Sequence, residues 1–418
     1  MIALIDCDNF YVSCEQLFNP ALRGKPVVVL SSNDGCVVSR SPEARALGVK
    51  MGEAAFERDD FYKKHNVAVY SSNYALYADI SERVTATVAR FGFNVDKYSI
   101  DECFIELTQI SNYEEYASRI RKTILQWTGI PTKIGVARTK TLAKVASEET
   151  KKGFGADGVR VLIDEDSVKD ALKQTDITDI WGIGWRHGKR LKQHGINTAY
   201  ELCETSDAWI KKNLSVVGLR TVFELRGTPC LALEIIEQNK KSICMSRSFG
   251  KMLTDPNVIR EALATHVAQC AEKLRRQNSC ANLLSISLRT NPFREDLPQY
   301  YASKVIQLPV PTSSTLELVR YAMMGFDMIF KEGYLYKKAG AFVTGIVPSE
   351  QVQDNLFDEV DRSVENTLSD TLDRINSRYG RDFIRLGVQG TKKEWRSRQE
   401  HLSQRFTTRW DELLTVKI

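Results

Sequence analysis

The feature that most constrains this chain is a pair of adjacent carboxylates, Asp101 and Glu102, set between two apolar segments. Residues 98–100 and 103–107 are rich in β-branched and aromatic side chains, which predicts two short strands that meet at an acidic tip. Neighbouring carboxylates repel each other, and a bound divalent cation removes that penalty. A surface hairpin with an acidic turn is the alternative that this stretch leaves open.

A third carboxylate stands near the start of the chain. Residues 1–5 are all apolar, as in a strand buried on both faces, and the run stops at Asp6 and Asp8. Asp6, Asp101 and Glu102 at strand ends would suit two Mg²⁺ ions, which prefer oxygen ligands and clamp the oxygens of a phosphoryl displacement. For Asp8, a helix cap is an equally good interpretation.

The length and the charge of the chain limit which classes of protein it can belong to. A chain of 418 residues is too long for one compact core, so several domains are expected. The formal net charge of +5 is unevenly spread, because residues 240–294 carry ten Lys or Arg against three Asp or Glu. This asymmetry suits modules that bind a polyanion.

The cysteines and the apolar runs predict a compartment. The nine cysteines form no C-x-x-C pair, which argues for reduced thiols and against a disulfide framework or a zinc ribbon. The opening apolar run lacks the basic flank of a signal peptide, and no run approaches the about 20 apolar residues of a membrane span. We therefore expect a cytoplasmic protein with no membrane partner.

Apolar periodicity predicts a split ferredoxin-like domain in the N-terminal part. If residues 20–72 are set aside as an insertion, the order is β-α-β-β-α-β, a pattern that can place Asp6 beside Asp101. The elements expected here are helices at residues 13–18, 41–47, 74–91, 113–127 and 139–150, and strands at 26–30 and 132–137.

From about Asp164 the pattern changes to short helices around two glycines. Gly182 and Gly184 stand in a tight apolar turn before a helix at 186–193, and a second helix is expected at 199–203. This is a helix-hairpin-helix signal, in which backbone N–H groups at a helix N-terminus receive a phosphate of nucleic acid. A glycine-capped helix corner is the alternative. The cations that would add charge are Arg186, Lys189 and Arg190.

A second β-α-β-β-α-β pattern begins near Lys240. Its lysines and arginines favour a surface that grips a phosphate backbone, with a merely solvated basic face as the alternative. Past Pro348 the apolar content drops, which indicates a tail. The elements expected in the second pattern are helices at residues 258–274 and 316–330, and strands at 283–288, 304–308 and 339–347.

Several stretches together resemble the Y-family translesion DNA polymerases. Residues 6–11, 99–102 and 182–184 match that family in order and spacing. Nearly the whole chain is similar, more specifically, to its UmuC-type members, the catalytic subunits of bacterial DNA polymerase V. The stretches that carry this closer likeness are residues 33–36, 71–79, 139–144 and 244–249.

The resemblance implies an α+β multidomain fold. Its parts would be a ferredoxin-like palm with inserted fingers, a helical helix-hairpin-helix thumb, a second βαββαβ domain called the little finger, and a tail. The implied boundaries are palm at 1–19 and 73–163, fingers at 20–72, thumb at 164–236, little finger at 237–349 and tail at 350–418.

The resemblance also implies an activity. It is template-directed, error-prone translesion DNA synthesis in the SOS response to DNA damage, by two-metal-ion nucleotidyl transfer. Asp6, Asp101 and Glu102 would be catalytic and would hold two Mg²⁺ ions, with the Cys7 carbonyl assisting. DNA contacts would include Arg247 besides the thumb residues.

The resemblance further implies contacts to the incoming deoxynucleotide. Tyr11 would be the steric gate that excludes ribonucleotides by a clash with the 2′-hydroxyl, although a core tyrosine is the alternative. Pro42 stands where many relatives carry a phosphate-binding Tyr, so one contact should be missing. The nucleotide-binding positions are Phe10, Tyr11, Ser39, Arg45 and Lys151.

The partners implied are primer-template DNA, a sliding clamp, a UmuD′-type dimer and the RecA filament, with the protein nucleoid-associated when active. Only the clamp has a legible motif, with Gln353, Leu356 and Phe357 as its binding residues. In that motif Asp354 replaces the usual Leu, which weakens the match.

Two other functions are consistent with parts of the pattern. A non-catalytic DNA-binding scaffold would share the basic modules but would not need three carboxylates at strand ends. A palm-like nucleotidyl cyclase would need the carboxylates but would gain nothing from a grip on a phosphate backbone. Primer extension with Mg²⁺ separates the polymerase from the scaffold.

Overall fold

The computed structural model describes residues 1–92, 94–236, 238–353, 355–356, 358 and 360–414. The chain divides into two compact units. The first comprises Met1–Ser31, Gly35–Glu237 and His401–Ile418, and the second comprises Ser32–Asp34 and Gln238–Glu400.

A five-stranded sheet forms the centre of the first unit, with strand order β5-β6-β1-β7-β8. β1 is antiparallel to both β6 and β7, and β8 joins β7 in parallel. β1 is buried because strands pair with both of its edges and helices pack on both faces of the sheet, as its unbroken apolar run predicts. The strands are β1 (Ile2–Cys7), β5 (Val95–Asp96), β6 (Glu102–Glu106), β7 (Thr132–Ala137) and β8 (Val159–Leu162).

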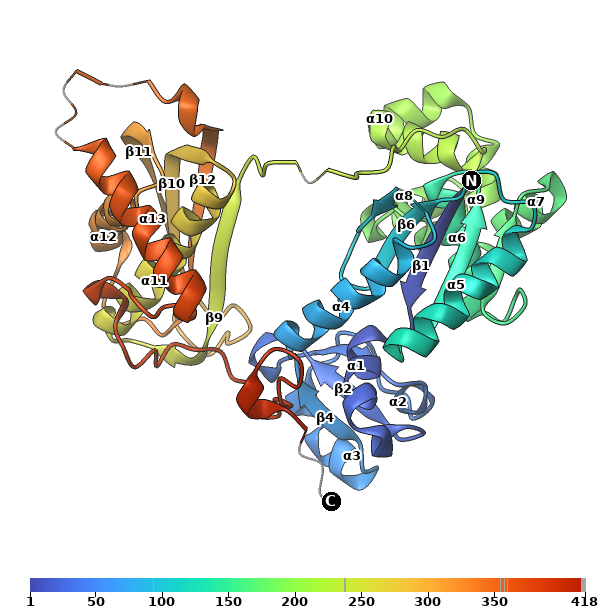
Figure 1. Ribbon diagram of the computed structural model, residues 1–418, viewed down its shortest axis with the longest axis horizontal. Coiled ribbons are helices and arrows are strands. Elements are labelled where there is room, and N and C mark those ends of the chain that lie inside the picture. Colours follow the sequence, from blue (N-terminus) through green and yellow to red (C-terminus); the bar gives the residue numbers. More distant parts are fainter. Residues whose placement is uncertain (93, 237, 354, 357, 359, 415–418) are drawn as a thin grey trace. The chain divides into compact units, whose positions relative to one another are not determined.

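Helices cover both faces of this sheet (Figure 1). Side chains of β1 at Ala3 and Ile5 pack with α1, α4 and α5, whereas Leu4 packs with α6 on the opposite face. Gly135 of β7 lets α6 approach closely, since a Cβ there would lie 2.2 Å from the Ala143 carbonyl oxygen. The helices are α1 (Phe10–Phe18), α4 (Tyr74–Val88), α5 (Tyr113–Thr128) and α6 (Lys140–Lys151).

The segment between α1 and α4 builds a small subdomain of its own. Its three strands are ordered β3-β2-β4, and a separate apolar cluster includes Val28, Val37 and Tyr62. Pro42 begins α2, and the Ser41 hydroxyl caps it by accepting from the Ala44 N–H. The elements are β2 (Val27–Leu30), β3 (Val37–Arg40), β4 (Ala68–Ser71), α2 (Pro42–Ala46) and α3 (Asp59–Lys64).

Four helices follow the central sheet and pack against α6 through a shared apolar cluster. At the turn before α8, Gly182 has a φ of 88°, a left-handed conformation that favours glycine. Gly184 caps α8 from an extended conformation. The helices are α7 (Glu165–Gln174), α8 (Trp185–Gln193), α9 (Ala199–Cys203) and α10 (Asp207–Leu225).

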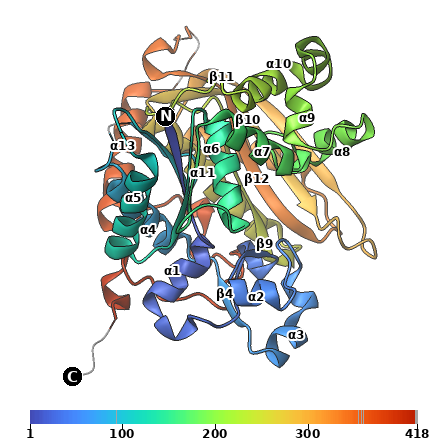
Figure 2. The same cartoon turned by 90° about the vertical axis from the view of Figure 1, so that its right-hand side faces the viewer.

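The second unit is a four-stranded antiparallel sheet in the order β11-β10-β12-β9, whose strands are labelled in Figure 2. The helices α11 and α12 pack in one apolar cluster with it. A further helix, α13, joins this unit through an ion pair between Asp373 and Arg275 of α11. The elements are β9 (Ile243–Leu253), β10 (Ser279–Thr290), β11 (Tyr301–Thr312), β12 (Tyr336–Pro348), α11 (Pro256–Arg276), α12 (Thr315–Ile329) and α13 (Arg362–Tyr379).

The predicted order of elements is confirmed in both βαββαβ modules, and the α+β class with it. One predicted strand is wrong. Residues 98–100 form a turn, and the strand that pairs with β6 lies earlier, at β5. The expected tail is also more structured than its composition indicates, because it contains α13. The palm, fingers, thumb and little-finger boundaries stay predictions.

No helix among the described residues combines the length and the apolar character needed to cross a bilayer. The compartment predicted from the sequence therefore stays a prediction.

Replacing Gly135 by Ala should destabilise the first unit, because the new Cβ would also lie 2.4 Å from the Ser147 nitrogen of α6. We expect a loss of about 1–3 kcal/mol or more in unfolding free energy, measured by urea denaturation. Gly387→Ala is the matched control, since its Cβ would meet nothing within 4 Å. Equal stability of the two variants would show that α6 is not held at Gly135.

Candidate active site

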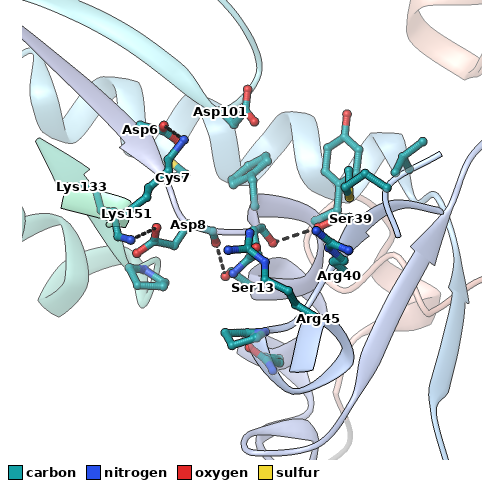
Figure 3. A pocket seen from close by; sticks show the side chains of 18 of the residues that line it. Asp6, Cys7, Asp8, Ser13, Ser39, Arg40, Arg45, Asp101, Lys133 and Lys151 are labelled. Carbon is teal, nitrogen blue, oxygen red and sulfur yellow. Dashed lines mark hydrogen bonds and ion pairs between the residues drawn. The ribbon is translucent and has the colours of Figure 1, made fainter. Parts of the chain in front are cut away.

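A cavity of about 870 Å³ opens where the end of β1 meets the three-stranded subdomain (Figure 3). Asp6 and Asp101 face it from the central sheet, and Arg40 and Arg45 face it from β3 and α2. Carboxylates and cations in one open cavity suit a polyanionic ligand accompanied by metal ions. The remaining lining residues include Cys7, Asp8, Phe10, Tyr11, Ser39, Pro42, Lys133 and Lys151.

The three predicted carboxylates meet at the pairing of β1 with β6. Asp6 is the register partner of Glu102, and the Cys7 N–H donates to the Asp101 carbonyl oxygen at 2.9 Å. Backbone hydrogen bonds between β1 and the segment that begins β6 thus bring Asp6, which lies early in the chain, to the acidic tip. Glu102 is not among the residues that line the cavity, whereas Asp6 and Asp101 are.

A serine builds the turn that presents Asp101. The Ser99 hydroxyl donates to Asp101 Oδ1 at 2.5 Å and accepts from the Glu102 N–H at 3.0 Å. The Ser99 N–H in turn donates to the Glu102 carbonyl oxygen at 3.0 Å. These short-range bonds hold residues 99–102 in a turn, which explains why no strand forms there.

Two lysines of α6 neutralise two of the carboxylates. Nζ of Lys151 lies 2.7 Å from Asp6 Oδ2, and Nζ of Lys144 lies 2.7 Å from Glu102 Oε2. Burial raises the pKa of Asp6 to about 6, against the opposing effect of Lys151, and the Glu102 and Asp101 charges add to the rise. The effect of burial on Asp6 therefore outweighs that of the Lys151 ammonium beside it.

The donor set fits divalent metal ions. Asp6 is only 6% exposed and is the register partner of Glu102, so a hard cation would compensate for the burial, and for the Glu102 charge, that raise its pKa. Among the described residues, however, no group of three or more metal-binding side chains is already arranged around one point. Side-chain rotation away from Lys151 and Lys144 would have to accompany metal binding.

The predicted nucleotide-binding residues lie around the same cavity. Ser39 is largely committed to the fold, since its hydroxyl donates to the Asn9 carbonyl oxygen at 3.2 Å. The Arg45 guanidinium is exposed and has no side-chain partner among the described residues, which leaves it available to an anion. Phe10 is buried beneath the cavity at 3% exposure.

Tyr11 lies at the cavity with its ring stacked on Tyr77, at a centroid distance of 4.6 Å and an interplanar angle of 15°. Tyr74 packs edge-on against the same ring at 6.0 Å. Burial, Tyr74 and Asp101 raise the pKa of Tyr11 to about 12, so its phenol stays neutral. Tyr11 is half-buried and packs against the apolar cluster that contains Phe10 and Tyr77, and its role as the gate stays a prediction.

The predicted DNA-binding residues lie on separate units. Gly184, Arg186 and Lys189 are exposed around the start of α8. Arg190 instead donates to the Asn213 carbonyl oxygen at 3.0 Å, which gives it a structural role. Arg247 is an exposed residue of β9 in the second unit.

Of the predicted clamp-binding residues, Gln353 and Leu356 are exposed, Leu356 at 99%. Phe357 and the atypical Asp354 lie outside the described residues.

Sequence reasoning missed three charged residues of this region. Lys133 pairs with Asp8 at 3.7 Å, so Asp8 contributes to an ion pair and not to the side-chain capping of α1. Arg40 donates to the Val49 carbonyl oxygen at the cavity edge. Lys144, like Lys133, comes from an element whose residues were expected only as scaffold, and periodicity carries no signal for such pairs.

Comparison with known families gives four consecutive matches. The impB/mucB/samB family model matches residues 5–148, its helix-hairpin-helix motif 165–196, and its C-terminal domain 240–356. A domain of unknown function, DUF4113, matches residues 366–416. Protein UmuC of Salmonella typhimurium strain LT2 is 40% identical over the full length of both chains.

The chain belongs to the impB/mucB/samB family. Protein ImpB of Salmonella typhimurium is 39% identical, again over all of both chains. DNA polymerase IV of Clostridium acetobutylicum is 27% identical over 87% of this chain and 89% of its own. Among solved structures, a Dbh–Dpo4 Y-family polymerase chimera matches the fold with a TM-score of 0.67 and 21% identity, covering 83% of this chain and 100% of its own.

This family member is a UmuC-type Y-family DNA polymerase. It is a DNA-directed DNA polymerase for error-prone translesion synthesis, the catalytic subunit of a polymerase V-like enzyme. The family implies catalysis with divalent metal ions. The scaffold and cyclase alternatives thereby lose their support.

Replacing Lys151 by Met should raise the affinity of the nucleotide-free enzyme for Mn²⁺ by about 10-fold, equivalent to about 1.4 kcal/mol. The reason is that the cation no longer has to displace an ammonium group held 2.7 Å from Asp6. Isothermal titration with Mn²⁺ measures the change. Lys152→Met is the control, because Lys152 pairs at 3.9 Å with Asp179 and not with Asp6. An unchanged Mn²⁺ affinity in Lys151→Met would argue against Asp6 as a metal ligand.

Proposed function

We propose that Asp6, Asp101 and Glu102 hold two Mg²⁺ ions, with the Cys7 carbonyl oxygen as a further ligand. The observation that carries the proposal is the β1–β6 register, which sets Asp6 opposite Glu102 while the Cys7 N–H bonds to the Asp101 carbonyl oxygen. Three carboxylates at one sheet edge beside a large charged cavity supply the hard oxygen ligands that Mg²⁺ prefers.

The incoming deoxynucleoside triphosphate would occupy the cavity between the central sheet and the three-stranded subdomain. Arg45 and Lys151 would bind its phosphate oxygens as cations, and Ser39 would add a hydroxyl where its bond to Asn9 allows. Pro42 also lines this cavity, so a phosphate contact from a hydroxyl is absent at that position.

The reaction is an in-line displacement on the α-phosphate. The primer 3′-hydroxyl loses its proton to solvent and attacks the α-phosphorus, a new P–O bond forms while the bond between the α-phosphorus and the bridging oxygen breaks, and pyrophosphate leaves with the electrons of that bond. When bound, the metal ions would lower the pKa of that hydroxyl and stabilise the charge on pyrophosphate. Lys151, released from Asp6, would neutralise part of the phosphate charge.

We assign Tyr11 as the steric gate. It lines the cavity one residue after Phe10, and its ring is held by Tyr77 and Tyr74, so it cannot easily yield to a bulkier sugar. A rigid aromatic ring beside the ribose would overlap a 2′-hydroxyl and leave a 2′-hydrogen undisturbed.

Primer-template DNA would be gripped at its backbone by the start of α8, through Gly182, Gly184, Arg186 and Lys189, and by Arg247 of β9. Arg190 would support this surface through its bond to Asn213. The proposed protein partners are a UmuD′-type dimer, the RecA filament and a sliding clamp reached through Gln353 and Leu356. Action at the nucleoid in the cytoplasm belongs to the same proposal.

Replacing Asp101 by Ala should lower primer extension with Mg²⁺ by about 10²- to 10³-fold, the size of the loss when one electrostatic contact to a transition state is removed. Binding of primer-template DNA, measured by fluorescence anisotropy, should stay within about twofold. Asp170→Ala, which removes an exposed carboxylate of α7, is the control. Retained synthesis in Asp101→Ala would reject the metal assignment.

Replacing Tyr11 by Ala should reduce the preference for deoxynucleotides over ribonucleotides by about 10- to 200-fold, the factor given by relief of about 1–3 kcal/mol of overlap. Single-nucleotide insertion kinetics with each sugar measure the preference. Tyr11→Phe keeps the ring and should keep the discrimination. If sugar preference is the same in Tyr11→Ala and the unmodified enzyme, Tyr11 is not the gate.

A further inference from the structure

The C-terminal segment His401–Phe406 packs against the first unit beside the three-stranded subdomain. The Ser71 N–H at the end of β4 donates to the His401 carbonyl oxygen at 3.0 Å, and the His401 N–H donates back to the Ser71 hydroxyl at 3.0 Å. The ring of Phe406 stacks on Phe18 at the end of α1, with centroids 4.7 Å apart and planes at 11°. The segment is therefore fixed at both ends.

Between these two anchors, the segment binds the start of α4. The Asn73 side chain caps α4 by accepting from the Leu76 N–H, and its amide group donates to the carbonyl oxygens of Ser403 and Gln404, each at 3.2 Å. Asn73 is only 2% exposed. One buried side chain thus joins the C-terminal segment to the helix turn that carries Tyr74 and Tyr77.

The central contact of the segment is with a buried carboxylate. Glu15 of α1 is 2% exposed, and its Oε1 accepts from the Ser403 hydroxyl at 2.9 Å and from the Tyr77 hydroxyl at 2.7 Å. Burial raises the pKa of Glu15, and these two hydrogen bonds oppose the rise. A buried carboxylate is costly without such donors, so Ser403 supplies part of what keeps Glu15 and Tyr77 in place.

Tyr77 in turn forms the wall behind Tyr11. It is fully buried, and the Tyr11 ring stacks on it almost in parallel. A chain of direct contacts therefore runs from Ser403 through Glu15 and Tyr77 to Tyr11 at the cavity. Each link is a hydrogen bond or a ring stack between closely packed side chains. A displacement of Ser403 would therefore be transmitted through Glu15 and Tyr77 to Tyr11.

We propose that His401–Phe406 is a positioning element of the nucleotide pocket, in which Ser403 holds the Glu15–Tyr77 pair and thereby sets how strictly Tyr11 excludes ribonucleotides. This inference rests on the proposed role of Tyr11 as the gate. It assigns a task to part of the region that matches only a domain of unknown function, residues 366–416. Ser403 acts through Tyr77 and touches no substrate.

The test is sugar discrimination by the full-length enzyme with Ser403→Ala, measured as kcat/KM for deoxynucleotide over ribonucleotide insertion. We expect the ratio to fall by about 3- to 10-fold through a lower KM for the ribonucleotide, with deoxynucleotide kcat within about twofold. Ser403→Thr keeps the hydroxyl and should restore the ratio. Thr408→Ala is the matched control, because Thr408 is exposed and its side chain has no partner among the described residues.

Double variants show whether the effect runs through the named contacts. In a Tyr77→Phe background, which removes the other donor to Glu15, Ser403→Ala should change the ratio much less than it does alone. In a Tyr11→Ala background it should change nothing further. Full additivity in either background, or a Ser403→Ala ratio equal to that of Thr408→Ala, would overturn the proposal.

Failure of the gate itself gives a different result. If Tyr11→Ala leaves sugar preference unchanged, the gate assignment is wrong. Hydrogen exchange then tests separately whether the segment His401–Phe406 positions α4. Ser403→Ala should speed amide exchange in residues 74–77 relative to Thr408→Ala, since the α4 cap Asn73 loses the hydrogen bond that its amide donates to the Ser403 hydroxyl at 3.0 Å. Equal exchange in the two variants would overturn the positioning role as well.

Discussion

The antiparallel pairing of β1 with β6 is the constraint on which the active site depends. It sets Asp6, which is buried, opposite Glu102, which is partly exposed, so two carboxylates face each other where β1 ends and β6 begins. Such a pair is tolerable only with positive charge nearby, and α6 supplies it through Lys151 and Lys144. The polymerase therefore folds around a charge arrangement that its own lysines stabilise before any ligand arrives.

In the proposed site, Lys151 would link metal binding to nucleotide binding. A cation that took the Asp6 carboxylate would compete with Lys151, and the released ammonium would face the cavity where a triphosphate would bring negative charge. Glycine at position 135 matters because it brings the backbone of α6 against β7, and a side chain there would push both lysines outward. The chemistry of the site is thus tied to the closeness of one helix to one sheet.

Local patterns in the sequence predicted most of the fold. The strand at Thr132–Ala137 and the helix at Ala199–Cys203 have the predicted bounds, and the acidic tip stands at the edge of the predicted sheet. The errors lie where one side chain decides the backbone, as when Ser99 bonds across its own turn and prevents a strand. Composition likewise hid α13, because its polar surface resembles that of a disordered tail.

What the sequence could not predict is contact between distant residues. Ser403 and Glu15 are 388 positions apart, and neither has a neighbour whose pattern points to the other. Yet that contact helps to explain how a carboxylate can be buried at position 15. A buried carboxylate with one hydrogen-bond donor is much less stable than a buried carboxylate with two. Ser403 therefore stabilises a residue of the first helix, α1. Through Glu15 it also helps to hold Tyr77, the ring that packs behind Tyr11.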